Sequence, residues 1–153
     1  MTNQDSSVRQ MAEKAKKASL AIANFSNEDK NRLLHEISLR VQKKADLIAE
    51  KNQLDIQEAE KMQAAGEITA PLVNRLKLNE EKIKQLSTYL EEVAKLEDPV
   101  GKRQFAMKLD ENLELERVTC PLGVVAIIFE SRPEVVIQVT ALSLKSGNAV
   151  ILK

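Results

Sequence analysis

The sequence is short of the residues that mark several classes of protein. Its 153 residues include no tryptophan, one tyrosine, three phenylalanines, one histidine and one cysteine. So few aromatic side chains exclude a surface on which nucleic-acid bases stack. A lone cysteine excludes a framework of intrachain disulfides. We expect no metal site and no nucleic-acid partner.

Charge of one sign and long hydrophobic runs are also missing. Lys plus Arg and Asp plus Glu number 23 each, so no net basic field attracts nucleic acid or an anionic membrane. The longest apolar run, Val124–Phe129, is far shorter than the roughly 20 residues of a membrane-spanning helix. The first ten residues contain no apolar core of a signal peptide. We therefore expect a cytoplasmic protein without a membrane partner.

The last part of the chain, Cys120–Lys153, has the pattern of a strand–helix–strand unit. Val124–Phe129 is a continuous apolar run rich in β-branched residues, typical of a parallel strand covered on both faces. Helical spacing from Pro133 to about Ser146 is apolar on almost all sides, which indicates a buried helix. A second strand is expected over Ala149–Leu152. Short connections predict a right-handed crossover and parallel strands.

The turn 130–132, with the sequence Glu-Ser-Arg, connects the first of these strands to the helix. Ser131 and Glu134 form the S-x-x-E pattern of a capping box, and Pro133 suits the first helical turn. Ligands of open α/β sheets bind at the carboxyl ends of the strands. We therefore expect the turn and Lys153 to lie on one edge of the sheet and to form the ligand site.

Cys120 and His35 are the other residues with reactive side chains. Cys120 precedes Pro121 at the entry to a strand and has no histidine near it in the sequence. We interpret it as a structural thiol, buried or half-buried, rather than a nucleophile. His35 lies beside the apolar stripe of a helix and is expected at the surface.

Residues 1–100 predict a helical region with a solvated, charged outer face. The pattern of apolar residues and caps predicts helices over Ser7–Phe25, from Ser26 as N-cap to about Lys51, over Gln53–Ala65, and over Glu80–Leu96 with Asn79 as N-cap. A short turn or helix is expected through Thr69–Arg75.

Residues 101–119 predict a β-hairpin, with strands 103–109 and 113–119 around a polar turn. A two-stranded ribbon is only marginally stable alone, so we expect it to rest on another surface. The chain then stops on an apolar strand, and two parallel strands do not complete a sheet. We interpret it as the first half of a doubly wound domain.

The stretch PLGVVAIIFESRPEVVIQVTALSLKSGNAVILK closely resembles the amino-terminal part of the γ-glutamyl phosphate reductase (glutamate-5-semialdehyde dehydrogenase) family. The segments 52–55, 73–76 and 97–101 resemble the same family. The resemblance implies an α/β fold of the aldehyde dehydrogenase superfamily. Within a partial NADP-binding domain spanning 1–153 it implies helices over 1–100, an oligomerisation-like hairpin arm over 101–119 and the first βαβ unit of a doubly wound parallel sheet over 120–153, without the catalytic domain.

The family resemblance also implies a reaction and roles for individual residues. Members reduce γ-glutamyl phosphate with NADPH to glutamate 5-semialdehyde and phosphate in proline biosynthesis. Ser131 falls where the superfamily places an asparagine that stabilises the oxyanion, and it is expected to contact the cofactor as well. Arg132 is expected to bind a substrate phosphate or carboxylate, with Glu130 orienting it. Lys153 matches a lysine that binds the cofactor, and the hairpin implies a homo-oligomer.

The catalytic cysteine of that family lies beyond Lys153, and Cys120 does not match its motif. We therefore expect these 153 residues to be inactive alone. The residues also leave simpler interpretations open: Ser131 can serve only as a helix cap, and Arg132 only in a surface ion pair. Two other functions are consistent with the sequence, namely another acyl-phosphate or acyl-thioester reductase of the superfamily and a non-catalytic helical interaction module.

Overall fold

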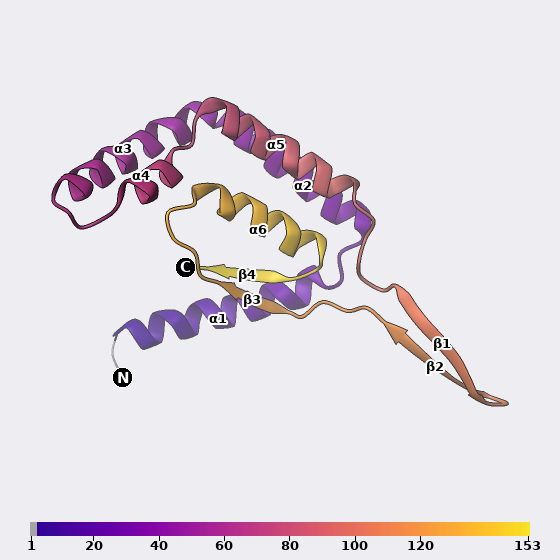
Figure 1. The fold of residues 1–153 in the computed structure, drawn as a ribbon. Coiled ribbons are helices and arrows are strands. Elements are labelled where there is room, and N and C mark those ends of the chain that lie inside the picture. Colours follow the sequence, from indigo (N-terminus) through magenta and orange to yellow (C-terminus); the bar gives the residue numbers. More distant parts are fainter. Residues whose placement is uncertain (1–2) are drawn as a thin grey trace.

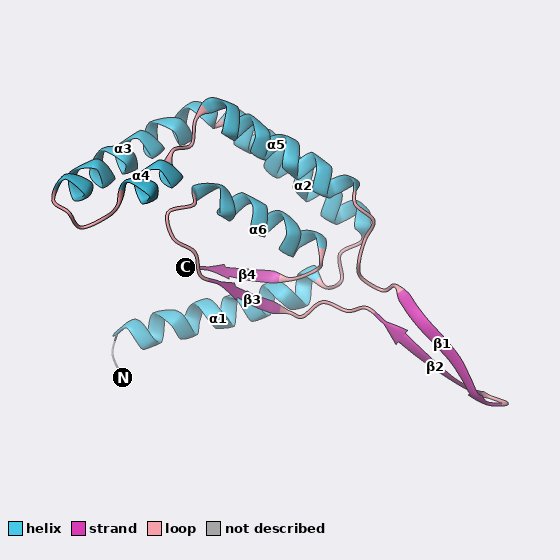
Figure 2. Ribbon diagram, in the orientation of Figure 1, coloured by secondary structure: helices cyan, strands magenta, loops and turns pink. Residues whose placement is uncertain are grey.

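The computed structural model describes the backbone of residues 3–153 and the side chains of residues 7–153. The described chain is an α/β structure in which helices surround a two-stranded parallel sheet and a separate hairpin projects from one end (Figures 1 and 2). The elements are α1 (Asn3–Ile22), α2 (Asn27–Lys43), α3 (Ala45–Ala64), α4 (Ala70–Leu76), α5 (Glu80–Lys95), β1 (Arg103–Asp110), β2 (Leu113–Val118), β3 (Val124–Ile127), α6 (Pro133–Lys145) and β4 (Ala149–Leu152).

The hydrophobic core lies where α2, α5 and α6 pack together. Leu34 on α2, Ile83 and Leu90 on α5 and Ala141 on α6 are almost completely buried. Each belongs to the apolar stripe of its helix, so burying these stripes against one another accounts for the packing. Helices α2 and α5 lie side by side along most of their length (Figure 1).

Two predicted helix caps are confirmed. The hydroxyl of Ser26 accepts a hydrogen bond from the Asp29 amide at 3.1 Å, and the Asp29 carboxylate accepts one from the Ser26 amide at 3.3 Å, which completes a capping box. Asn79 Oδ1 accepts from the Lys82 amide at 2.9 Å at the start of α5. Both caps use atoms three residues apart, which is why sequence alone identifies them.

The predicted break near Lys51 and Asn52 is wrong, because the helix breaks at Lys44 and Asn52 lies inside α3. Asn52 is buried, its amide group donates to the Leu76 carbonyl, and its carbonyl accepts from the Leu78 amide, both at 2.8 Å. These bonds fasten α3 to the connection between α4 and α5. Asparagine is a weak helix former, and here tertiary hydrogen bonds override that preference.

Strands β3 and β4 are parallel, as predicted, with Val124 paired to Ala149 and Ile127 to Leu152. Helix α6 covers one face of this sheet, and α1 packs against the other (Figure 1). The coverage is incomplete, so the expectation of a fully covered strand and a buried helix is wrong: the side chains of β3 are at most half-buried, and Leu142 on α6 is 49% exposed. Within the described chain, two strands leave too little sheet to bury all sides of α6.

The hairpin of β1 and β2 is confirmed, but within the described part of the chain it does not rest on another surface. Every residue of both strands is exposed, and the ribbon projects away from the helices (Figure 1). Its base is fixed by Thr119, whose hydroxyl donates to the Pro99 carbonyl at 2.6 Å and accepts from the Lys102 amide at 2.9 Å. None of the helices in the described range has the length and hydrophobicity to cross a membrane.

Candidate functional site

The carboxyl ends of β3 and β4 form one edge of the sheet. The Phe129 amide donates to the Lys153 carbonyl at 2.9 Å, and the Lys153 amide donates to the Ile127 carbonyl at 3.0 Å. These bonds continue the parallel ladder to the last residue of the chain. The expectation that the turn 130–132 and Lys153 share an edge is therefore confirmed.

Ser131 has a left-handed backbone in this turn. Its φ of +54° is the only positive value for a non-glycine residue in the described chain. This conformation costs an ordinary L-residue about 1–2 kcal/mol. Backbone strain of this kind is concentrated at functional sites.

The capping box predicted from Ser131 and Glu134 is wrong. Arg132 occupies the N-cap position of α6, and no side chain among the described residues caps the helix there. The reason is Pro133, which disfavours helical geometry in the residue before it. Arg132 accordingly has φ −136° and ψ 78°, and Ser131 lies one residue too far out to cap α6. The Ser131 hydroxyl therefore does not cap α6.

The carboxylate beside Arg132 is that of Glu134, where we expected Glu130. Arg132 Nε lies 3.5 Å from Glu134 Oε1, with the arginine side chain 55% exposed. Glu134 Oε2 is buried and has no hydrogen-bond partner among the described residues. Glu130 is exposed. Among the described residues, Glu134 is thus the carboxylate that contacts Arg132, through Nε alone.

A polar cavity of about 510 Å³ opens beside this turn. It is lined by Asn74 and Arg75 from α4, Lys82 from α5, and Arg132 and Glu134 from the start of α6. Sequence reasoning missed this cluster, because three helices bring together residues up to about 60 positions apart. No short-range pattern in the sequence predicts such a cluster.

Cys120 lies away from the carboxyl edge, because it precedes β3 while Ser131 follows it. The thiol is exposed, so the expectation of a buried or half-buried cysteine is wrong. The neighbouring hairpin projects outward and leaves this residue uncovered. His35 is exposed as expected, and its Nδ1 lies 2.9 Å from Glu91 Oε1 on α5.

Lys145, at the end of α6, is a buried lysine. The residue is 3% exposed. Its Nζ donates hydrogen bonds to Asn27 Oδ1 at 2.8 Å, to Asn31 Oδ1 at 2.7 Å and to the Ala94 carbonyl at 3.0 Å. All three donors of the ammonium group are thereby used. Lys145 joins α6 to the start of α2 and the end of α5, away from the turn that carries Ser131.

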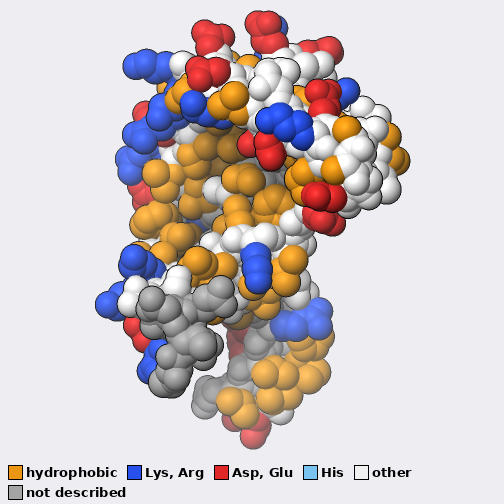
Figure 3. Space-filling view, turned by 90° about the vertical axis from the view of Figure 1, so that its left-hand side faces the viewer, with side chains coloured by type: hydrophobic (Ala, Val, Ile, Leu, Met, Phe, Trp, Pro, Cys, Tyr) orange, Lys and Arg blue, Asp and Glu red, His pale blue; other side chains and the backbone are white. Residues whose placement is uncertain are grey.

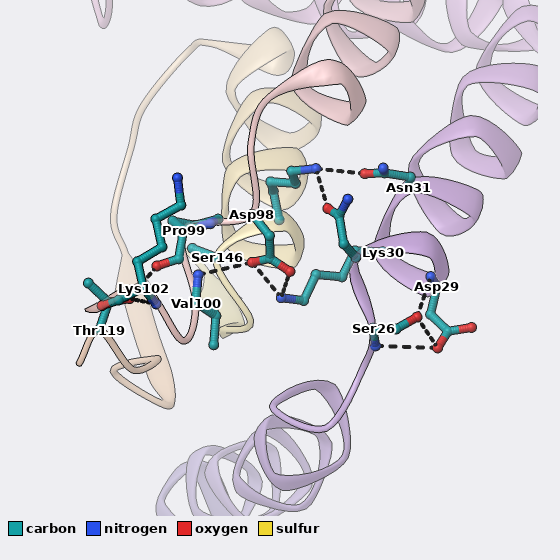
Figure 4. Close-up of polar contacts among 12 residues, drawn as sticks. Ser26, Asp29, Lys30, Asn31, Asp98, Pro99, Val100, Lys102, Thr119 and Ser146 are labelled. Atoms are coloured by element: carbon teal, nitrogen blue, oxygen red, sulfur yellow. Dashed lines mark hydrogen bonds and ion pairs between the residues drawn. The ribbon is translucent and has the colours of Figure 1, made fainter. Parts of the chain in front are cut away.

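Lys30 is also buried, and its Nζ donates to both carboxylate oxygens of Asp98 at 2.8 and 3.0 Å (Figure 4). Burial raises the pKa of Asp98, but the hydrogen bonds from Lys30 and the Val100 amide outweigh it and hold the pKa below its usual 3.8. Burial lowers the pKa of Lys145, with Asp98 opposing and Lys30 assisting that shift. Lys30 is thus an exception to the solvated, charged face that we expected for residues 1–100.

An open apolar groove of about 680 Å³ runs between α1, α2, α6 and β4. Figure 3 looks from the side of Figure 1 on which the chain ends lie, and hydrophobic side chains gather across the middle of that face between charged margins. The groove is lined almost wholly by apolar atoms, so its chemistry differs from that of the polar cavity beside Ser131.

The fold and this edge place the chain in the α/β class, with a parallel βαβ unit that presents a strained serine turn and a lysine at one edge of its sheet. No protein-family model matches it. Curated γ-glutamyl phosphate reductases from Methanosarcina mazei and Acetivibrio thermocellus are each 44% identical, over 92% and 96% of this chain. The chain spans only 31% and 33% of those relatives.

Solved structures agree with these relatives. A crystal structure of γ-glutamyl phosphate reductase from Saccharomyces cerevisiae matches with a TM-score of 0.88 and 41% identity, covering 94% of this chain and 36% of that one. One from Thermotoga maritima matches with a TM-score of 0.84 and 34% identity, covering 94% and 34%. The resemblance and the fold class expected from the sequence are confirmed: the chain is a homologue of about one third of a γ-glutamyl phosphate reductase.

Proposed function

We propose that this chain is part of an NADPH-dependent reductase that converts γ-glutamyl phosphate to glutamate 5-semialdehyde and phosphate in proline biosynthesis. The observation that supports this most is similarity at 44% identity over 96% of the chain to a relative of that name. The names of the relatives favour this over the two other functions that the sequence left open. A cytoplasmic location fits such a biosynthetic role.

The carboxyl edge suits a nicotinamide dinucleotide that carries a 2′-phosphate. Lys153 is an exposed cation at the end of β4, and Ser131 offers a hydroxyl at the end of β3. A lysine can pair with a phosphate as a mobile point charge. The cofactor supplies a hydride when bound. The roles of the chain in this proposal are to hold its ribose and phosphate through Lys153 and to contact it through Ser131.

Ser131 and Arg132 are the proposed contacts to the reacting substrate. The Ser131 hydroxyl donates to the oxygen that becomes negatively charged during acyl transfer, and loss of such a donor costs about 2.7–4 kcal/mol of barrier. Arg132 pairs with an anionic group of the substrate, because a guanidinium binds carboxylates and phosphates with two parallel hydrogen bonds. Glu134, rather than Glu130, positions Arg132.

The attacking thiolate comes from outside these 153 residues. The one cysteine, Cys120, precedes β3, while the proposed contacts follow β3 and β4. In this proposal the chain alone is inactive. The hairpin is the proposed surface for a homo-oligomer, because Phe105, Met107 and Leu115 lie on it with 46–48% of their surface exposed. A second copy covering these side chains would remove that apolar area from water.

A chimera tests the proposed function. This chain replaces the matching third of the Methanosarcina mazei relative, and NADP⁺ reduction is followed with glutamate 5-semialdehyde and phosphate. We expect activity that requires both the semialdehyde and phosphate, with the unaltered relative as reference. A chimera that is folded by circular dichroism and gel filtration but shows no phosphate-dependent reduction of NADP⁺ contradicts the proposal.

A further inference from the structure

The polar cavity beside Ser131 combines an excess of positive charge with one carboxylate. Arg75, Lys82 and Arg132 reach it from α4, α5 and the start of α6, and Glu134 is the one acidic side chain among the described residues that line it. The four side chains sum to two positive charges. This balance favours a ligand that carries anionic groups together with one cationic group.

The positive side of the cavity suits a carboxylate. Arg75 is exposed, and the Arg132 side chain is 55% exposed, so both guanidinium groups are accessible from the cavity. Lys82 Nζ donates one hydrogen bond to the Lys77 carbonyl at 2.7 Å, which leaves two of its three donors free. Guanidinium groups match the geometry of a carboxylate, and the lysine adds a flexible charge.

Glu134 provides the opposite chemistry. Its Oε1 faces Arg132, while its Oε2 is buried without a hydrogen-bond partner in the described chain. A buried carboxylate oxygen without a donor is unfavourable and rare in folded proteins. Rotation of the Glu134 carboxylate toward the cavity when a ligand ammonium group binds would give Oε2 a donor.

We propose that this cavity binds the α-amino-carboxylate end of an amino acid, with the carboxylate held by Arg75 and Arg132 and the ammonium by Glu134. That the amino acid is the glutamyl group of γ-glutamyl phosphate rests on the proposed function. Arg132 directly follows Ser131, so a glutamyl group anchored here extends its γ-carbonyl toward the serine turn. The cavity thereby selects an α-amino acid over a simple dicarboxylate.

Amide NMR of the isotope-labelled 153-residue chain tests this without catalysis. L-Glutamate, glutarate and inorganic phosphate are titrated into the wild-type chain and the Glu134→Gln and Lys84→Gln variants. Glutarate lacks the ammonium group. Lys84 is an exposed lysine two positions after Lys82, does not line the cavity and serves as the matched control.

We expect L-glutamate to shift the amides of residues 74–75, 82 and 132–134, with a Kd about tenfold lower than that of glutarate. Glu134→Gln should bring the ratio of the glutarate Kd to the L-glutamate Kd close to one, while Lys84→Gln should leave that ratio unchanged. Absence of shifts at these amides, equal affinity for the two acids in the wild-type chain, or a response to phosphate alone would overturn the proposal. An active chimera without glutamate selectivity refutes the subsite and leaves the proposed function standing, whereas selectivity in an inactive chimera refutes the reductase function.

Discussion

Phe129 and Lys153 are joined by a main-chain hydrogen bond of 2.9 Å at the point where β3 and β4 end. The bond brings the chain terminus beside the residue that leads into the turn 130–132. Ser131 in that turn has a left-handed backbone, and the polar cavity opens next to it. One edge of a small parallel sheet thus collects the proposed contacts for both cofactor and substrate.

Ser131 combines backbone strain with a proposed catalytic hydroxyl, and substitutions can separate the two. In the chimera, Ser131→Ala should lower kcat about 100-fold, because one hydrogen bond to the oxyanion is lost. Ser131→Gly should lower kcat similarly while raising the free energy of unfolding by about 1 kcal/mol, because glycine adopts φ +54° without strain.

Ser131→Asn is the matched restoring variant. Asparagine tolerates the left-handed region and carries a side-chain donor, so kcat should stay within about tenfold of wild type. Steady-state kinetics and urea denaturation provide the two readouts. Wild-type kcat in both the alanine and glycine variants would show that the hydroxyl has no catalytic role.

Asp98 should make stability depend on acid pH. Its pKa lies below 3.8 in the folded chain. The contribution of the ionised Asp98 to the free energy of unfolding is therefore complete above about pH 4, and it is lost as the pH falls through the pKa of the folded state. Asp98→Asn should lower the free energy of unfolding at pH 7 by about 3 kcal/mol, because Lys30 is left as a buried charge without its partner.

Urea denaturation of the wild type and the variant from pH 7 to acid measures this effect. The difference in the free energy of unfolding between the wild type and Asp98→Asn should narrow only below pH 3.8. Glu97→Gln is the control, since this neighbouring carboxylate is 84% exposed and should change stability little. A constant difference across the whole range would mean that ionisation of Asp98 is not the source.

Gly147 should tolerate substitution less well than Gly66, although both have left-handed backbones with φ of +73° and +78°. A Cβ on Gly147 would lie 2.8 Å from Pro121 Cγ, whereas one on Gly66 would meet no atom within 4 Å. We expect Gly66→Ala to lower the free energy of unfolding by about 1 kcal/mol, because alanine is strained in the left-handed backbone. Gly147→Ala should lower it by about 2–3 kcal/mol, because the clash with Pro121 adds to that strain.

Equilibrium unfolding of the two alanine variants compares them directly. An equal loss in the free energy of unfolding for the two variants would show that Pro121 moves aside without cost. A greater loss for Gly147→Ala supports close packing of the turn between α6 and β4 against the entry to β3.

The predictions that hold are those that depend on nearby residues. The caps at Ser26 and Asn79, the hairpin and the order strand–helix–strand follow from spacings of a few positions. The shared edge was also predictable, because the two strands of a short βαβ unit run parallel and therefore end at the same edge of the sheet. The Ser131 cap failed for a local reason as well, since the effect of Pro133 on Arg132 outweighed the S-x-x-E pattern.

The features that the sequence could not predict depend on distant partners. In the sequence, Lys145 has the position of an ordinary cation at a helix end. Its burial depends on hydrogen bonds to Asn27 and Asn31, more than 100 residues earlier. The break at Lys44 carries no glycine or proline signal. Glu134 was interpreted as part of a cap, and its unpartnered oxygen appears only once α6 is placed against its neighbours.

The most direct test of the proposed ligand-binding edge is the KM for NADP⁺ of the chimera with Lys153→Ala, compared with Lys44→Ala at an exposed position away from the sheet. We predict a KM about tenfold higher for Lys153→Ala, which corresponds to about 1.4 kcal/mol of lost binding, with kcat nearly unchanged and no effect from Lys44→Ala. An unchanged KM in the Lys153 variant would contradict the assignment of this edge to the cofactor.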